Sequence, residues 1–467
     1  MKKGFESDLI FLPQKLKLKA KPFMNKLSFN YTSNAKSISS FAGLKIYDDL
    51  IHKFEIRKLF GPFLPKKERS VGHTSWNKFY TLVLGFIAGF ECLDDFDFHG
   101  QDPLFSKLTN SPSSTTLGKF LKVFTQRQVE QIQELLPKYA LALRLSLTPN
   151  LNKMTFIMDA SDHQQYGLKT EGVTFGYKKF RCVSSQMIFD EKGLCYGFKL
   201  RSGNTHSVID GPEMLYKALS VVPKDFKKLF LADSAYSTME MYNTCLNQRC
   251  NFIICLKENV WAPILKKNHG HLKWKKTTLK FFDSSKCEMA SALYSPNGLA
   301  GGKKCLRVVF IRTKNLTPKK GDKHAYHYYA VVTDIGESEK NNDKIFKIYR
   351  KRSQVENNIK DLKNGMDFHH FPTGKLKANN IWGVAGIIAY NLMRYTSFQV
   401  AGERGCFLKT TRRKIILIAG EIITHARSIE IRLMNYINKE VCRIKAMINF
   451  VSTTDANRLR PRDGVKT

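Results

Sequence analysis

Two short apolar runs that each end in an aspartate constrain the fold of this chain more than any other feature. The first run is Phe156-Ile157-Met158-Asp159, and the second is Leu229-Phe230-Leu231-Ala232-Asp233. Short runs of large apolar residues are typical of buried strands. We therefore predict a sheet in which Asp159 and Asp233 emerge at the tips of two core strands. The alternative is that each aspartate merely caps the next turn, which is common in α/β proteins.

The segments around these runs alternate between strand and helix patterns. Between the two runs, the sequence predicts a hairpin about Glu191-Lys192-Gly193 and a helix over 212–219. After the second run, it predicts a helix over 239–248 and then the buried strand NFIICLK. This alternation indicates an α/β sheet. Residues 258–340 interrupt it with β-rich segments separated by turn residues, which we interpret as an insertion.

A helical pattern follows the insertion in the segment IYRKRSQVENNIKDLKNG. An α-helix over 343–363 would hold four polar side chains within an arc of roughly 60°, beside an apolar stripe. These side chains are Tyr349, Arg352, Glu356 and Lys363. Such a helix would pack on a core and hold a carboxylate at its rim, where it could bind a metal. The alternative is a solvated helix face carrying Arg–Glu pairs.

The remaining segments have helical spacing or no clear period. The sequence predicts a helix over 126–145 in the N-terminal part and two apolar helices near 379–399 and 412–434. The predicted parts are a basic arm over 1–40, a helical N-terminal DNA-binding domain over 41–150, the first part of the core over 151–257, the β-rich insertion over 258–340, the core helix with its glutamate over 341–372 and a C-terminal helical region over 373–467. The arm is either a phosphate-binding segment or a plain disordered tail.

The charge of the chain indicates a polyanionic partner. Lys and Arg number 76 against 40 Asp and Glu, which leaves a net charge of +36. A charge of this size repels itself unless a nucleic acid is the usual neighbour, although an AT-rich genome would also inflate the Lys content. The longest apolar runs, 79–90 and 381–393, are shorter than the roughly 20 residues that span a bilayer, and no basic amphipathic helix flanks an anchor. We expect no membrane binding.

The compartment predicted from the sequence is the inside of the cell. The N-terminal residues lack the continuous apolar core and cleavage site of a secretion signal. The ten cysteines are scattered singly, with no CxxC pair and no His-spaced cluster. We interpret them as reduced, buried thiols and expect a cytoplasmic, nucleoid-associated protein.

The spacing Tyr-x2-Arg-x3-Glu-x6-Lys resembles the signature of the DDE transposases encoded by bacterial insertion sequences, in the Tyr-Arg-Glu-Lys superfamily. Further blocks resemble the 1380 group of these enzymes and occur in its order: MDASDHQQYG, KLRSGNTHS, FLADSAYS and NNIWGVAGIIAYNLMRY. The acidic run GFECLDDFDFHGQDPLF also looks like the run that precedes an Asp-Pro in that group. The resemblance covers most of the chain.

The resemblance implies a fold and a catalytic site. The fold is α/β, with a ribonuclease H-like mixed-sheet core, a β-rich insertion, a preceding helical domain and C-terminal helices. Asp159, Asp233 and Glu356 match the catalytic, metal-binding carboxylates, with Asp162 as the less favoured first aspartate. They would bind two Mg²⁺ ions, with Mn²⁺ as a substitute, because carboxylate oxygens suit these metals better than zinc.

Other residues are predicted to contact DNA. By resemblance, Tyr349, Arg352 and Lys363 would engage phosphates of the transposon end. Arg201 is a further candidate, although its segment also has the residues of an ordinary turn. Trp261 and Trp274 would either hold an extruded base or pack as ordinary aromatic residues.

The resemblance implies a cut-and-paste transposase that binds terminal inverted repeats, cleaves their 3′ ends in a Mg²⁺-dependent reaction and joins them to target DNA. A homodimer on paired ends is expected, and a hairpin intermediate by analogy alone. The first alternative is a catalytically silent or domesticated sequence-specific DNA-binding protein derived from a transposase. A ribonuclease H-like nuclease acting on branched DNA or RNA–DNA hybrids is another. A basic RNA-binding protein would explain the charge and leave the carboxylates unexplained.

Overall fold

A computed structural model describes residues 37–66, 71–167, 169–281, 286–299, 305–315, 325–424 and 429–433. Most of the predicted basic arm and the C-terminal stretch 434–467 lie outside the described residues. From Ser37 onward the chain forms one compact unit. No helix in the described ranges is long and apolar enough to cross a membrane.

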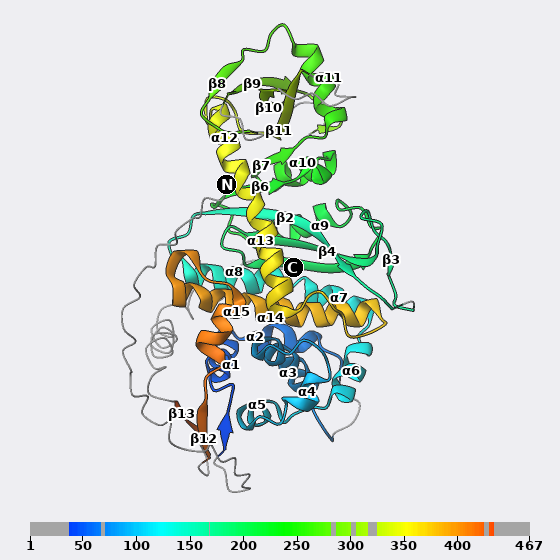
Figure 1. Cartoon of the computed structure of the whole chain (residues 1–467), viewed down its shortest axis with the longest axis vertical. Coiled ribbons are helices and arrows are strands. Elements are labelled where there is room, and N and C mark those ends of the chain that lie inside the picture. Colours follow the sequence, from blue (N-terminus) through cyan, green and yellow to red (C-terminus); the bar gives the residue numbers. More distant parts are fainter. Residues whose placement is uncertain are drawn as a thin grey trace, which may run out of the picture. The chain divides into compact units, whose positions relative to one another are not determined.

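The main sheet of the described residues is mixed and has ten strands (Figure 1). Its order is β3-β4-β2-β6-β7-β11-β10-β9-β8, and β5 also pairs with β4. The strands are β2 (Lys153–Gln164), β3 (Thr174–Phe175), β4 (Arg181–Asp190), β5 (Cys195–Ser202), β6 (Lys227–Ala232), β7 (Cys250–Cys255), β8 (Lys275–Thr277), β9 (Cys287–Tyr294), β10 (Leu306–Lys314) and β11 (Tyr326–Thr333).

Strands β2, β6 and β7 are parallel, as the predicted alternation requires. The connections between them carry the helices α9 (Gly211–Ser220) and α10 (Met239–Asn247), because a parallel crossover needs a connection of that length. The predicted helices over 212–219 and 239–248, and the hairpin between β4 and β5, are confirmed. The mixed α/β class predicted from the sequence is thus the observed one.

The prediction that Asp159 lies at the tip of its strand is wrong. Strand β2 pairs with β6 only up to Ile157, opposite Leu231, but it pairs with β4 as far as Gln164. The ladder to β4 keeps the chain extended after β6 has ended. Asp159 therefore sits within β2, just beyond the point where one of the two neighbouring strands stops.

The predicted β-rich insertion continues the core sheet. Strand β11 pairs antiparallel with β7, with Val331 opposite Cys255, and β10, β9 and β8 follow as antiparallel neighbours. The segment opens with a helix that the sequence analysis did not predict, α11 (Glu258–Asn268). Its Pro263 obscured the helical signal, although the helix accommodates this residue.

Helices precede the sheet, and a small second sheet accompanies them. The helices are α1 (Leu44–Lys53), α2 (Ile56–Phe60), α3 (Ser75–Ala88), α4 (Asp95–Phe98), α5 (Pro103–Thr109), α6 (Ser114–Lys122), α7 (Gln126–Gln133) and α8 (Leu136–Leu147), with a 3₁₀ turn, η1 (Gly61–Phe63). The single helix predicted over 126–145 is therefore wrong. It divides before Leu136 because Pro137 has no N–H for a continuing helix and suits a first turn.

The helix predicted over 343–363 is interrupted. It consists of α12 (Asn342–Tyr349), a 3₁₀ turn, η4 (Arg350–Ser353), and α13 (Gln354–Met366). The tighter 3₁₀ turn changes the angle between successive residues. Tyr349 and Glu356 are therefore held on separate helical segments.

The apolar helix predicted over 412–434 is also wrong. After α15 (Leu408–Thr411) and a π-helical turn, η6 (Arg412–Ile416), the chain forms β12 (Gly420–Thr424) and β13 (Ile429–Leu433). Strand β12 pairs with β1 (Ile38–Ser39), and β13 pairs with β12. β-branched isoleucines in this run favour strands, and a partner from the other end of the described chain lies beside them.

Helix α14 (Leu376–Ala401) lies between the sheet and the N-terminal helices (Figure 1). It is buried on nearly every side, as expected for a helix that is apolar all round. On one side Asn380 exchanges hydrogen bonds with the backbone of Leu200 in β5, and on another Tyr139 donates its hydroxyl to the carbonyl of Ile388 at 2.9 Å. The helix predicted near 379–399 is confirmed, and it joins the two parts into one core.

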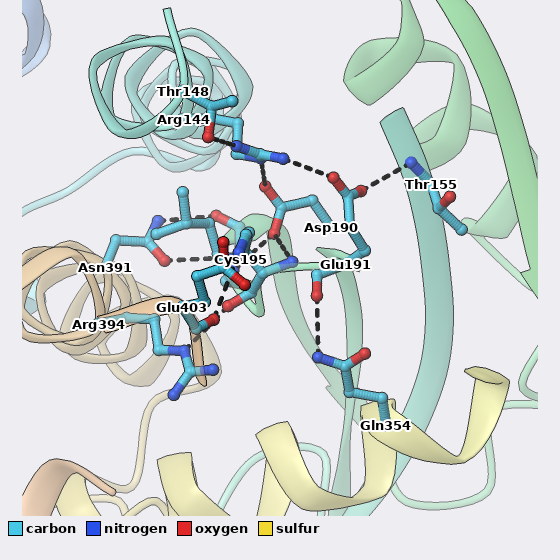
Figure 2. Close-up of polar contacts among 12 residues, drawn as sticks. Arg144, Thr148, Thr155, Asp190, Glu191, Cys195, Gln354, Asn391, Arg394 and Glu403 are labelled. Atoms are coloured by element: carbon cyan, nitrogen blue, oxygen red, sulfur yellow. Dashed lines mark hydrogen bonds and ion pairs between the residues drawn. The ribbon is translucent and has the colours of Figure 1, made fainter. Parts of the chain in front are cut away.

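A buried polar cluster ties α8, the sheet and α13 together (Figure 2). Arg144 of α8 lies 3.3 Å from Asp190 and donates to Glu191 at 2.6 Å, and its side chain is 3% exposed. The second carboxylate oxygen of Glu191 accepts from the backbone N–H of Thr155 in β2 at 2.7 Å. Gln354 of α13 donates to the Glu191 carbonyl at 2.9 Å. Burial and Glu191 raise the pKa of Asp190, whereas Arg144 and the backbone N–H groups of Leu194 and Lys192 favour its charged form.

We expect Arg144→Met to destabilise the fold strongly. The substitution leaves the Asp190 carboxylate, which is 0% exposed, without its cation, and breaking a buried pair in this way costs about 3–5 kcal/mol. Lys217→Met is the matched control, because Lys217 is 33% exposed and its partners Glu134 and Glu213 are at least half exposed. It should cost less than about 1 kcal/mol. Urea unfolding followed by circular dichroism measures both, and equal losses would contradict the role of the cluster.

Candidate active site

The end of strand β6 brings the first two predicted carboxylates together. Because Ile157 lies opposite Leu231, extending the parallel register by two residues sets Asp159 beside Asp233. Asp233 follows β6 directly and caps the 3₁₀ turn η2 (Ser234–Tyr236), where it accepts from the N–H of Ala235 at 2.9 Å. Both aspartates thus stand at the same edge.

The third carboxylate reaches this edge from α13. This helix packs on β2, and Glu356 lies in its first turn (Figure 1). The apolar side of the helix, including Val355 and Leu362, is buried, whereas the side chain of Glu356 is 61% exposed. The amphipathic pattern therefore places the carboxylate at the rim of the core, as the sequence predicts.

Arg352 bridges two of the carboxylates. Its guanidinium donates to Glu356 at 2.7 Å and lies 3.7 Å from Asp159. Burial alone would lower the pKa of Arg352, but Tyr349 and the surrounding carboxylates raise it overall. The guanidinium thus supplies the positive charge between the two acidic groups.

The electrostatics of Asp159 indicate a site with too much negative charge. Burial raises the pKa of Asp159 to about 6, and the neighbouring Asp233 and Glu356 add to the rise. The N–H of Ala160 and the charge of Arg352 oppose it without cancelling it. A perturbed carboxylate next to like charges is typical of a catalytic or metal-binding site.

The donor set suits a hard divalent cation, because all three groups are carboxylates. As the side chains lie, however, no cluster of three His, Cys, Asp or Glu residues in the described part of the chain is arranged to hold a metal. Glu356 is paired with Arg352 instead. Completing a metal site would require Glu356 to leave that ion pair.

A cavity of about 280 Å³ opens beside the carboxylates. Its lining consists of Asp159, Ala160, Ser161, Glu356, Ile359, Lys360, Lys363, Asn364 and His369. Lys363 donates to the backbone carbonyl of Asp162 at 2.5 Å, and burial lowers the pKa of its ammonium group. Acidic and basic groups therefore share one hollow, which could receive a phosphate between them.

The cavity includes residues that the sequence analysis missed. Lys360 and Asn364 follow Glu356 by four and eight positions, and that helical spacing could have identified them. His369 comes from the segment after α13 and has no such signal. Only the folded chain shows that it lies near the carboxylates.

Tyr349 lies beneath the site. It is 6% exposed and its hydroxyl is 3.0 Å from that of Tyr329. Burial raises its pKa, and so do Cys255 and Tyr329. Its predicted contact with phosphate stays a prediction.

Arg201 is also buried. Its side chain is 4% exposed, donates to the carbonyl of Ile209 and lies 4.0 Å from Asp210. Its Nε and Nη2 atoms have no hydrogen-bond partner in the structure. The predicted DNA contact of Arg201 stays a prediction.

The two tryptophans differ in their surroundings. Trp261 is 7% exposed and packs near Tyr328, with ring centroids 5.6 Å apart. Trp274 lies on the insertion under Arg312, whose guanidinium is 3.8 Å from the ring centroid. Trp261 is thus packed like an ordinary buried aromatic residue, whereas the face of the Trp274 ring is in contact with the Arg312 guanidinium.

Comparison with known proteins identifies one matching family. The family model of the transposase DDE domain group 1 matches residues 22–449, which include all three carboxylates and α13. No curated protein matches the chain.

We expect Asp159→Asn to stabilise the metal-free protein at neutral pH. The raised pKa means that the folded state binds this proton more tightly than the unfolded state, so ionised Asp159 penalises folding at every pH above about 6. The penalty disappears below about pH 4, where both states are protonated. A difference of roughly two pKa units corresponds to at most about 3 kcal/mol.

Thermal unfolding at several pH values measures this effect. The variant should exceed the wild type at pH 7.5, and the gap should close as the pH falls towards 4. Added Mg²⁺ should then stabilise the wild type and leave the variant unchanged, since only a ligand of the folded state shifts its stability. An equal gain at every pH would contradict the electrostatic explanation.

Proposed function

Because the chain belongs to the transposase DDE domain group 1 family, we propose that it is the DNA transposase of an insertion sequence resembling the 1380 group. It binds the terminal inverted repeats of its element, cleaves their 3′ ends and joins those ends to target DNA by a cut-and-paste reaction. The convergence of Asp159, Asp233 and Glu356 at the end of β6 is the observation that carries this proposal.

The strand order supports a ribonuclease H-like core. Strands β5, β4, β2, β6 and β7 are consecutive neighbours, antiparallel in the first half and parallel in the second. Helix α13 packs on β2 and presents its glutamate to the two aspartates. In the proposed assignment, the β-rich segment 258–340 is an insertion into this core, between β7 and α13.

Asp159, Asp233 and Glu356 would hold two Mg²⁺ ions, or Mn²⁺ as a substitute. When bound, such ions activate the attacking oxygen and neutralise charge on the leaving oxygen of an in-line displacement. The chain itself provides no covalent nucleophile in this mechanism. Its carboxylates must be ionised to serve as ligands, so a metal ion competes with the proton at Asp159, whose pKa is raised to about 6 in the metal-free protein.

The basic residues of the site would position the DNA. Arg352 holds Asp159 and Glu356 in the structure, and it becomes available to a phosphate once Glu356 turns from the ion pair. Its planar guanidinium suits bidentate contact with phosphate oxygens. Lys363 and Lys360, which also line the cavity, supply charge for the adjacent phosphates. Tyr349 would contribute its hydroxyl to the same phosphates, as the resemblance implies.

Double-stranded DNA is the proposed partner, both as terminal repeats and as target. The net charge of +36 supports this partner, because each phosphate contact releases counterions and strengthens binding. We also propose a homodimer on paired ends and a nucleoid-associated place in the cytoplasm. A catalytically silent descendant that binds the repeats without cutting them is the alternative that the next experiment excludes or establishes.

Glu356→Gln should abolish cleavage and leave DNA binding in place. The amide has the shape of the carboxylate but cannot supply its charge to a cation, so cleavage should fall at least about 100-fold. The measurement is cleavage of labelled terminal-repeat DNA in Mg²⁺, with binding followed by fluorescence anisotropy.

Asp162→Asn is the matched control. Asp162 lies three residues beyond Asp159 on β2, so its side chain points to the opposite face of the sheet. This variant should cleave at close to the wild-type rate. Tight binding without cleavage by wild type and variants alike would establish the silent DNA-binding protein instead.

A further inference from the structure

The hairpin between β3 and β4 carries two exposed aromatic rings that lie outside the hydrophobic core. Tyr177 is 98% exposed and Phe175 is 68% exposed. They stand at the turn over 176–180, whose backbone is held by two hydrogen bonds: Gly176 N–H to the Phe180 carbonyl at 3.0 Å, and Lys179 N–H to the Gly176 carbonyl at 2.9 Å. The tip is therefore an ordered turn that presents Tyr177 to solvent.

The charges at this tip are positive and unpaired. Lys178 and Lys179 follow Tyr177 directly and are exposed. Among the residues that the structure describes, neither lysine forms an ion pair with an acidic side chain. A surface with free ammonium groups beside a planar apolar ring complements a ligand that combines phosphates with planar faces.

The tip lies close to the part of β2 that follows Asp159. Gly176 lies beside Asp162, since a Cβ atom built on this glycine would be 3.8 Å from the Asp162 carboxylate. Asp162 follows Asp159 by three residues on β2, which is roughly 10 Å along the strand. Lys363, whose pKa is lowered mainly by burial, is also close enough to feel the charge of Lys178. The tip is thus roughly 10–20 Å from the carboxylates, or about three to six base pairs along a duplex at 3.4 Å per step.

We propose that the hairpin tip 176–180 is a DNA-contacting element of the transposase. Lys178 and Lys179 bind backbone phosphates about three to six base pairs from the cleaved bond, and Tyr177 stacks on a base that is unpaired or extruded at that point. The inference rests on the proposed function, and it adds a contact to the carboxylate site and to the residues of α13. DNA fits this tip better than a protein does, because two unpaired lysines directly follow the residue that carries the exposed ring.

The experiment measures binding of the full-length chain to a terminal-repeat duplex by fluorescence anisotropy. Tyr177→Ala should weaken binding about 5- to 100-fold, the range for loss of one base–aromatic stack, and Tyr177→Trp should restore it. Tyr216→Ala is the matched control. Tyr216 lies on α9 and is 52% exposed, and the substitution removes the same aromatic ring from a different surface. It should bind as the wild type does. Thermal unfolding of each variant confirms that an exposed ring leaves the fold intact.

The phosphate contacts of the two lysines are tested by the salt dependence of DNA binding. Lys178→Ala combined with Lys179→Asn should reduce the slope of log affinity against log salt by about 2, one unit for each lost phosphate contact. Asparagine is used at 179 because that residue has a φ of 60°, in the left-handed region that asparagine tolerates. An unchanged slope would show that neither lysine contacts a phosphate, and that part of the proposal would be wrong.

The outcomes separate this inference from the proposed function. If the wild type cleaves repeat DNA and Tyr177→Ala binds it equally well, the hairpin contact is overturned and the transposase assignment stands. If the wild type neither binds nor cleaves repeat DNA, the proposed function fails first. If Tyr177→Ala changes self-association in sedimentation and leaves DNA affinity unaltered, the tip is a protein interface and the proposal is overturned.

Discussion

The parallel pairing of β2 with β6, and the residue at which it stops, sets the geometry of the whole site. Their register puts Ile157 opposite Leu231, so the next polar residue on each strand is an aspartate at the same height. A shift of one residue would turn Asp159 to the other face of the sheet, because side chains alternate along a strand. Burial is the main cause of the raised pKa of Asp159, and this pairing adds to the rise because it places Asp233 beside Asp159.

Helix α14 and the Glu191 cluster keep that edge in place. Helix α14 packs against β5 on one side and the N-terminal helices on the other, so the sheet has a continuous core beneath it. Glu191 contacts three elements at once: Arg144 in α8, Thr155 in β2 and, through its carbonyl, Gln354 in α13. Gln354 is two residues from Glu356, so the position of the third carboxylate depends on a buried charge network far from the cavity.

Much of the core could be predicted from the sequence, because its signals are local. Short continuous apolar runs identified β2, β6 and β7, and helical spacing placed Glu356, Lys363 and the buried helix α14. The failures concern long-range partners. The run after Arg412 forms strands because β1, more than 370 residues earlier, pairs with it, and β2 runs past Asp159 because β4 does. His369 and the burial of Arg201 likewise depend on contacts that no spacing encodes.

The hydrogen-bonded junction between β7 and β11 makes the insertion mechanically part of the sheet that carries the candidate site. A domain attached by two flexible linkers can swing without disturbing its host, but here three residue pairs, from Val331–Cys255 to Thr333–Ile253, join the two across a ladder. Force applied to the insertion would therefore twist the sheet, and β7 lies directly beside the strand that carries Asp233. Load on the insertion would therefore change the spacing of the strands that carry the candidate carboxylates.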